Sequence, residues 1–295
     1  MKSRNQIDGP VVIGGIGGSG TRVIAEILKE LNFFIGNDLN GPLDNLFYTL
    51  LFKRRKWLYN HRTNRRLLFR GLSILEKRMT RTSCLYFPEY LFLVKACISM
   101  SIHGHNKEKD GSGTWPLERI KKMFESLGGE IHNYVGWGWK EPNSHLLIEA
   151  MNEFFPNFKY IHIIRHGLDM AFSENQQQLY NWGPMFGVDL PKASHEIPLA
   201  SFRYWVKANR LALEKGEKLG SKRFLWINYD QFCVDPKSGI QKLLSFLEVK
   251  ADDSIIKKCV ELPKVATSSG RFRNYDLDGF EDKDFAFLKS LGFLI

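Results

Sequence analysis

The stretch PVVIGGIGGSGTRVIAEILKEL, residues 10–31, decides the fold class of this chain. Its first part, residues 11–13, is a short apolar run with β-branched side chains, which is typical of a buried strand. After the glycines, apolar residues recur with the helical period, at Val23, Ile24, Ile27, Leu28 and Leu31. The stretch therefore predicts a strand, a tight glycine-rich loop and a helix.

The same alternation continues along the chain. We expect strands at 134–139, 160–164 and 224–228, and helices at 144–155, 168–178, 199–219, 236–246 and 282–291. The run 160–164 is almost wholly apolar, as in a buried parallel strand. This order favours an α/β fold, a parallel sheet flanked by helices on both faces.

The region at about 40–130 has a different character and is expected to be a mostly helical insert after the first helix. Helices are predicted there at 43–59, 65–79, 89–101 and 116–127. We find no internal repeat and no linker that divides the sequence. We therefore expect one domain over residues 1–295 that includes the insert.

Composition sets wide limits on the function. The 295 residues are 43% hydrophobic and 25% charged, which excludes a disordered or fibrous protein. No apolar run reaches the length that spans a bilayer, and the first ten residues do not resemble a secretory signal. The four cysteines show neither metal-site spacing nor the density of a disulfide framework. A cytoplasmic location is expected.

The net charge of +10 has a single location. From Lys53 to Arg81 the chain carries eleven Lys and Arg residues and one acid, Glu76, so the remainder is formally neutral. Leucines alternate with these charges, as in a basic amphipathic helix. The segment is either a solvated helical face or a docking surface for an acidic acceptor or a membrane. Nucleic acid is not favoured, because no nucleic-acid module is visible.

The glycine-rich loop from Gly14 to Arg22 predicts an anion site. Glycines let the backbone approach a ligand, and the following helix offers unpaired N–H groups at its positive end. The spacing of Gly15 and Gly20 fits a Walker A loop, but Thr21 occupies the lysine position. Gly15, Gly17 and Gly20 also form a G-x-G-x-x-G pattern, with Asp38 roughly twenty residues later as in dinucleotide-binding proteins. A third interpretation is a loop that holds a phosphosulfate.

A second anion site is predicted at the end of the strand 160–164. Arg165 follows this strand directly, where α/β folds bind ligands, and its fork suits a phosphate. Ser173 comes eight residues later in the expected next helix, and Asp169 lies between them.

At these residues the chain resembles the sulfotransferases that use 3′-phosphoadenosine 5′-phosphosulfate (PAPS). Arg165, Asp169 and Ser173 match the family's R-x-P-x-D-x-x-x-S pattern, with Gly167 in place of the proline. Residues 226–247 resemble the family's strand, Y-E-D-L, D-P and helix segment, and residues 269–275 resemble its late G-R-W loop. The matches keep the family's order and extend from residue 11 to 275, with 40–130 unmatched.

The resemblance implies a P-loop-like fold and a set of donor-binding residues. The 5′-phosphosulfate would be bound by Gly17, Gly18, Ser19, Gly20, Thr21 and Arg22. The 3′-phosphate would be bound by Arg165, Ser173, Gly270, Arg271 and Arg273. Tyr229 would lie near the adenine. No metal is expected, because His103 and His105, the closest histidine pair, lie in a polar loop.

The sequence departs from the family at Gly18, where a Lys or Arg usually contacts the leaving group. Arg22 and Lys140 are the expected substitutes, since Lys140 lies in a W-K-E-P motif at the end of a predicted strand. The same motif makes Glu141 the expected general base, with His145 and His166 in reserve.

The sequence thus predicts sulfuryl transfer from PAPS to a hydroxyl or amine of a small-molecule, glycan or lipid acceptor. Two alternatives remain open. One is an NAD(P)-dependent oxidoreductase based on the G-x-G-x-x-G pattern, and the other is a degenerate protein that binds a nucleotide or polyanion without turnover.

Overall fold

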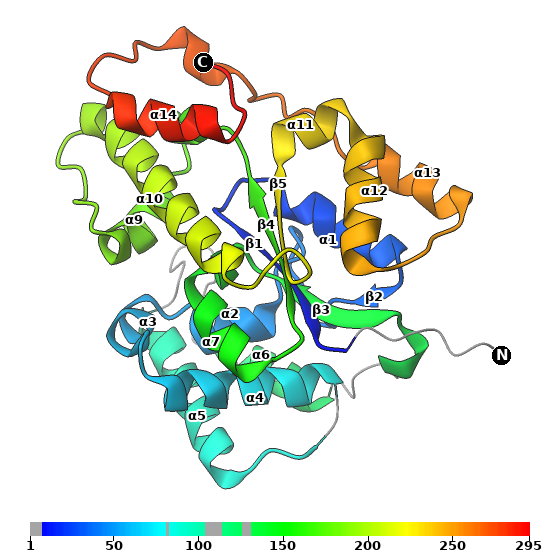
Figure 1. Ribbon diagram of the computed structural model, residues 1–295. Helices are drawn as coiled ribbons and strands as arrows, with labels where there is room; N and C mark the ends of the chain where they lie inside the picture. The colour runs from blue at the N-terminus through cyan, green and yellow to red at the C-terminus, as the bar shows by residue number, and fades with distance from the viewer. Residues whose placement is uncertain (1–7, 81–82, 104–113, 126–130) are drawn as a thin grey trace.

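The computed structural model describes residues 8–80, 83–103, 114–125 and 131–295. A parallel sheet of five strands lies at its centre, in the order β2-β3-β1-β4-β5. Its strands are β1 (Pro10–Gly15), β2 (Phe33–Phe34), β3 (Gly136–Lys140), β4 (Lys159–Ile164) and β5 (Phe224–Asn228). Val12 of the central strand is in register with Trp139 on one side and Tyr160 on the other. Figure 1 shows the sheet edge-on between two groups of helices.

One face of the sheet is covered by α1 (Thr21–Glu30), α11 (Tyr229–Val234), α12 (Pro236–Leu247) and α13 (Asp253–Glu261). Their buried side chains pack in one cluster with the alternate strand residues Val11, Ile13, Ile161 and Ile163. The helix α1 begins at the residue after Gly20 and buries Ile24, Ile27 and Leu28, the positions that the 3.6-residue period predicts.

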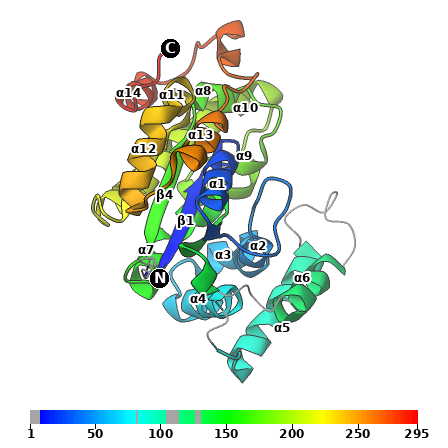
Figure 2. The ribbon, with the colours of Figure 1, turned by 90° about the vertical axis from the view of Figure 1, so that its right-hand side faces the viewer.

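The other face carries α2 (Leu46–Phe52), α4 (Arg65–Thr80), α7 (Ile148–Phe154) and α10 (Ile197–Glu217). Buried residues of these helices form a second cluster with Trp139, Tyr160 and Ile164 of the strands. The shorter helices around them are α3 (Arg55–His61), α8 (Gly167–Ala171), α9 (Gln177–Trp182) and α14 (Asp282–Ser290). In Figure 2, α5 (Phe87–His103) and α6 (Thr114–Glu125) lie at the outer side of the region at 40–130.

The structure confirms the α/β fold class, the parallel sheet with helices on both faces and the helical character of 40–130 in its described parts. The sequence pattern does not indicate β2, since two phenylalanines are too short a run to show a period. The helices α11 and α13 are also absent from the predicted elements.

Three predicted helices differ in detail. The helix expected at 43–59 is interrupted after Phe52, where Arg54 turns back and donates to the carbonyl of Leu51 (2.8 and 3.1 Å). Residues 142–147 form a 3₁₀ helix before α7. The helix expected at 168–178 ends at Ala171, so Ser173 lies in the bend between α8 and α9 and not in a helix.

Candidate active site

Four strands end at the same edge of the sheet, and the residues that follow them meet there. A cleft of about 510 Å³ opens at this edge. Of the residues predicted from the sequence, the cleft is lined by Gly17, Gly18, Gly20, Thr21, Arg22, Lys140, Arg165, Ser173, Tyr229 and Arg271. Both predicted anion sites therefore belong to one cavity, in the position where parallel α/β sheets bind ligands.

The glycine-rich loop turns tightly from β1 into α1. Gly18 and Gly20 have φ angles of 89° and 88°, in the left-handed region that glycine adopts without strain. A Cβ on Gly20 would overlap the ring of Tyr229, so this position also requires a residue without a side chain. Gly20 caps α1 without a side-chain hydrogen bond, and the N–H groups of the first turn lie at the cleft. This helix end suits an anion.

Ser19 has a different position from the one that the sequence predicts. Its hydroxyl and its backbone N–H both donate to the carbonyl of Ile16, and its side chain is buried. It does not line the cleft. The structure therefore assigns Ser19 to the turn itself, while Thr21 lines the cleft.

No cation replaces the family's Lys or Arg at Gly18, where a Cβ would meet open space. Arg22 lines the cleft at the start of α1, but its side chain is 59% exposed and lies 3.7 Å from Glu26. The buried cation at this end of the cleft is Lys140, whose side chain is only 3% exposed.

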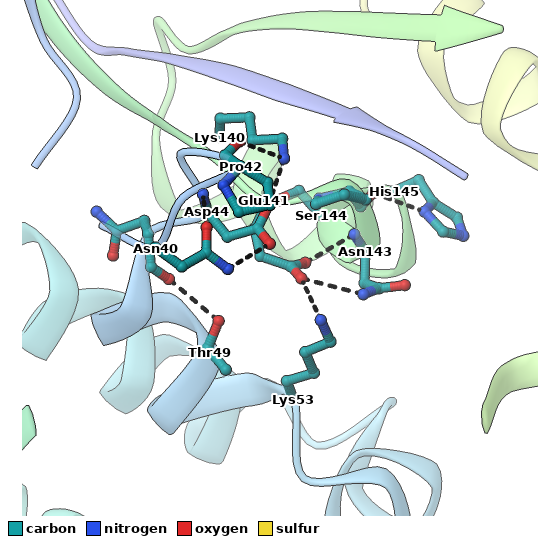
Figure 3. Close-up of polar contacts among 12 residues, drawn as sticks. Asn40, Pro42, Asp44, Thr49, Lys53, Lys140, Glu141, Asn143, Ser144 and His145 are labelled. Carbon is teal, nitrogen blue, oxygen red and sulfur yellow. Dashed lines mark hydrogen bonds and ion pairs between the residues drawn. The ribbon is translucent and has the colours of Figure 1, made fainter. Parts of the chain in front are cut away.

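Lys140 ends β3 and points toward residues 40–45 (Figure 3). Its Nζ forms an ion pair with Asp44 and donates to the carbonyl of Pro42 (3.1 Å). The second carboxylate oxygen of Asp44 accepts from the side-chain amide of Asn40 (2.9 Å), and the Asp44 backbone N–H donates to Asn40 (2.7 Å). Asp44 lines the cleft, so a carboxylate and an ammonium lie side by side within it. The sequence pattern does not indicate Asp44, which lies in an irregular loop.

Glu141, the expected general base, is fully buried and is absent from the cleft wall. Its carboxylate accepts from the backbone N–H of Asn143 (2.7 Å) and from that residue's side chain (3.1 Å). Lys53 reaches it from the end of α2 at 3.0 Å (Figure 3). This geometry does not support Glu141 as the base, because its oxygens cap the 3₁₀ helix and tie β3 to α2.

Arg165 extends from the end of β4 toward the late loop at 268–272. Its Nη2 donates to the hydroxyls of Ser268 (2.8 Å) and Ser269 (3.4 Å), whereas its buried Nε has no partner among the described residues. Asp169 lies 4.0 Å from Arg165 and accepts from the backbone N–H of Gly270 (2.9 Å). Asp169 therefore holds the late loop against the end of β4. Arg165 itself lines the cleft.

Residues of the late loop line two different cavities. Arg271 lines the cleft with Ser173 and donates to the carbonyls of Ser268 (3.3 Å) and Phe172 (3.4 Å). Gly270 and Arg273 line a neighbouring cavity, and the exposed Arg273 lies over the ring of Phe272 (5.5 Å). Arg271 thus agrees with the predicted location, while Gly270 and Arg273 do not lie in the cleft.

Aromatic side chains form part of the cleft wall. Burial raises the pKa of Tyr229 to about 12, and its hydroxyl donates to the carbonyl of Lys264 (3.1 Å). Tyr204 of α10 and Gln178 of α9 also line the cleft. Each has a buried polar oxygen without a hydrogen-bond partner among the described residues. The sequence pattern did not indicate either residue, because both lie within ordinary helix patterns.

The reserve histidines are structural in this geometry. Burial lowers the pKa of His145, whose ring contacts the carbonyl of Pro142 (3.0 Å). His166 stacks on Phe272 (4.5 Å) and its ring contacts the carbonyl of Leu294 (2.7 Å). Neither lines the cleft.

Asp38, the acid of the dinucleotide pattern, does not face the glycine-rich loop. It is buried and pairs with Arg119 (2.7 Å) and Lys122 (2.8 Å) of α6. A carboxylate held in this way is not available to a ribose, so the geometry removes the second element of the oxidoreductase interpretation.

The basic segment is not one uniform surface. Lys53 pairs with Glu141, Lys77 with Glu89 and Arg65 with Glu153, at 3.0, 2.8 and 2.7 Å. Arg54 is buried over the ring of Trp57 (3.9 Å), and burial lowers its pKa to about 9. Among the described residues of the segment, the exposed cations are Arg55, Lys56, Arg62 and Arg66, and Arg81 lies outside the described residues.

The described residues contain neither a metal-binding group nor a helix that could span a membrane. No group of three or more His, Cys, Asp or Glu side chains is arranged to hold a metal ion in this part of the chain. Among the described helices, none has the length and hydropathy to cross a membrane. His105, one of the histidine pair discussed above, lies outside the described residues.

Comparison with known proteins gives one family. A profile of the Sulfotransferase family matches residues 10–253. Protein-tyrosine sulfotransferase A from Caenorhabditis elegans is 25% identical over 140 residues, 44% of this chain and 33% of that protein. An uncharacterised protein from Aquifex aeolicus is 27% identical over 132 residues, 44% of this chain and 16% of that protein. The chain thus spans a third or less of the length of these relatives.

Solved sulfotransferase structures align over most of this chain. The sulfotransferase domain from the curacin biosynthetic pathway aligns over 98% of this chain and 99% of its own length, with a TM-score of 0.50 and 13% identity. Sulfotransferase STF9 from Mycobacterium avium aligns over 97% and 76%, with a TM-score of 0.49 and 13% identity. The expected P-loop-like fold class is confirmed. Because the family profile matches most of the length of this chain, the chain belongs to the Sulfotransferase family.

Proposed function

We propose that this protein transfers a sulfuryl group from PAPS to a hydroxyl or amine acceptor. The observation that carries the proposal is the single cleft that joins the N-terminus of α1 to the Arg165, Ser173 and Arg271 site. PAPS carries two separate anionic groups, a 5′-phosphosulfate and a 3′-phosphate. Two anion sites in one cavity match that charge distribution.

The two ends of the cleft have distinct roles in this proposal. The backbone N–H groups of Gly20 and Thr21 and the guanidinium of Arg22 would bind the 5′-phosphosulfate. Arg165, with its unpaired buried Nε, would bind the 3′-phosphate together with Ser173 and Arg271. Tyr229 lines the cleft with its ring against Gly20, where it would limit the position of the adenosine.

Lys140 and Asp44 would supply the catalytic chemistry. In an in-line displacement the acceptor oxygen or nitrogen bonds to sulfur while the bond from sulfur to the 5′-phosphate oxygen breaks, which releases 3′-phosphoadenosine 5′-phosphate (PAP). Lys140 would stabilise negative charge on the transferring group and the leaving phosphate, the role of the cation missing at Gly18. Asp44 would accept the acceptor's proton, since it is the carboxylate beside Lys140 at the cleft.

The acceptor would reach the cleft from the helical region at 40–130, which supplies Pro42, Asp44 and Lys53 to its wall. The proposed acceptors are a small molecule, a glycan or a lipid. A cytoplasmic location remains our expectation, and all four cysteines are free thiols, as a reducing compartment requires.

The test is calorimetric binding of PAP to the purified protein. Arg165→Ala should weaken binding about 10- to 150-fold, because it removes a charge-assisted contact worth roughly 1.5–3 kcal/mol. Arg273→Ala is the matched control, since this arginine comes from the late loop and lies outside the cleft. Equal affinity of the two variants would contradict the assignment of the 3′-phosphate site.

A protein that binds the nucleotide without turnover is the second candidate, and the open space at Gly18 is the observation that favours it. A single-turnover experiment with labelled PAPS and a panel of hydroxyl and amine acceptors distinguishes the two. Labelled product supports the transferase. Tight PAP binding without product from any acceptor class would favour the binding protein.

A further inference from the structure

The helix α5 exposes an apolar face that no described residue covers. Its exposed side chains follow the helical period, and their exposed fractions lie between 45% and 73%. We name this set the α5 apolar face; it consists of Phe87, Tyr90, Leu91, Val94, Ile98 and Ile102. Phe124 of α6, 39% exposed, extends it by stacking on Tyr90 with ring centroids 5.7 Å apart.

The opposite side of α5 is apolar as well. Phe92, Leu93, Ala96 and Met100 are buried there. The first two and Met100 belong to the hydrophobic cluster on this face of the sheet. A helix that is apolar all round is normally covered on every side, by protein or by lipid. Single exposed apolar residues need no explanation, but a continuous stripe of this length marks an interaction surface.

The charges around the face are positive. Lys95 is the exposed cation of α5, and the guanidinium of Arg78 lies 5.8 Å from the ring of Phe124. The neighbouring helix α3 contacts the buried side of α5, where the ring centroids of Trp57 and Phe92 are 5.6 Å apart, and it exposes Arg55 and Lys56.

The described acids of α5 and α6 are each paired with a cation. Glu89, the acid of α5, is buried and paired with Lys77 at 2.8 Å. The acids of α6, Glu118 and Glu125, pair with Arg119 (3.2 Å) and Lys121 (3.5 Å). The surroundings of the α5 apolar face therefore favour a partner that is apolar and negatively charged.

We propose that the α5 apolar face docks on the surface of a bilayer that contains anionic lipids. An anionic bilayer presents negative headgroups above hydrocarbon, and this surface presents cations beside apolar side chains. The helix would lie in the interface plane, in keeping with its failure to meet the length and hydropathy of a membrane span. A symmetric contact between two copies is less favourable, because it brings like cations together.

The test is co-sedimentation of the full chain with vesicles of phosphatidylcholine alone or with about 30% phosphatidylserine. We expect binding to the mixed vesicles that decreases with added salt. Val94→Glu/Ile98→Glu should reduce the partition coefficient at least about ten-fold, because it places two charges at the interface. Arg78→Gln/Lys95→Gln should reduce it by about ten-fold, through the lost attraction of two cations.

The matched control is Leu190→Glu/Leu211→Glu, which adds the same charges at exposed leucines away from α5. It should bind the mixed vesicles as the wild type does. PAP affinity, measured in parallel, should be unchanged in every variant, which separates failure of this proposal from failure of the proposed function. The proposal is overturned by equal binding to both vesicle types, by no binding to either, or by a wild-type dimer that Val94→Glu/Ile98→Glu dissociates in analytical ultracentrifugation.

Discussion

The sheet-edge cleft and the helical region at 53–125 use positive charge in opposite ways. In the cleft, Lys140 and Arg165 are each fixed by contacts to a loop from elsewhere in the sequence, residues 42–44 and 268–269. In the helical region, Arg55 and Lys56 are exposed at the start of α3 and Arg62 directly after its end. The cleft has few cations, each in a defined position, whereas the helical region has many that are exposed and not held by carboxylates.

The difference shows that net charge does not locate a ligand site. The residues outside 53–81 are formally neutral, yet they carry four of the five cations that line the cleft, and Lys53 is the fifth. A fixed cation in a partly buried cleft recognises a defined anion, since little solvent screens it. Exposed cations act together on an extended surface, and salt weakens their effect.

Among the cations of the cleft, we expect the largest effect on activity from Lys140. Lys140→Ala should reduce the rate of labelled sulfate transfer by about 10³-fold, since a fixed donor to developing charge is removed. The measurement is single-turnover transfer to an acceptor identified in the panel. The control Lys159→Ala removes a lysine that pairs with Glu248 (2.9 Å) and lies outside the cleft. A rate within a few-fold of the wild type would show that Lys140 only supports the loop of Asp44.

The helical region contains two lysines, three residues apart, with opposite environments. Lys53 contacts the fully buried Glu141, whereas Lys56 is exposed three residues later. Lys53→Met should lower the free energy of unfolding by about 3 kcal/mol, because it leaves a buried carboxylate without its cation. Lys56→Met should change it by less than about 0.5 kcal/mol. Urea unfolding at neutral pH measures both, and equal effects would show that Asn143 alone satisfies Glu141.

Local patterns in the sequence predicted the parts of the site that depend on local structure. The apolar run before the glycines and the period after them place Gly20 and Thr21 at the start of a helix. The apolar run before Arg165 places that arginine at the sheet edge. Both inferences need only strand and helix periods and the rule that parallel strands end at one edge.

The remainder of the site depends on contacts between distant segments. Asp44 reaches Lys140 because residues 40–45 pair with the end of β3, where the Asn45 N–H donates to the Lys140 carbonyl (2.8 Å). The motif around Glu141 shows a carboxylate beside a strand end, but not that Lys53 covers it. Ser19 fits a phosphate loop by type, and only its turn back to Ile16 removes its hydroxyl from the cleft.

The sheet beneath the cleft contains a buried histidine that makes the stability of the protein depend on pH. His162 of β4 is completely buried between the Tyr160 hydroxyl (3.0 Å) and Asn209 (2.9 Å). Burial lowers its pKa to about 3, from 6.5 in an unfolded chain. Between these values the unfolded chain binds a proton that the folded chain does not, so stability falls as the pH decreases from about 6.5 toward 3.

At pH 5 this histidine should lower the free energy of unfolding by about 2 kcal/mol relative to pH 7.5. Burial also lowers the pKa of His145, which adds a change of the same sign. His162→Gln should remove the first contribution and flatten the pH dependence of urea unfolding, whatever its effect at pH 7.5. If His162→Gln keeps the wild-type slope, the acid sensitivity of the protein arises from groups outside β4.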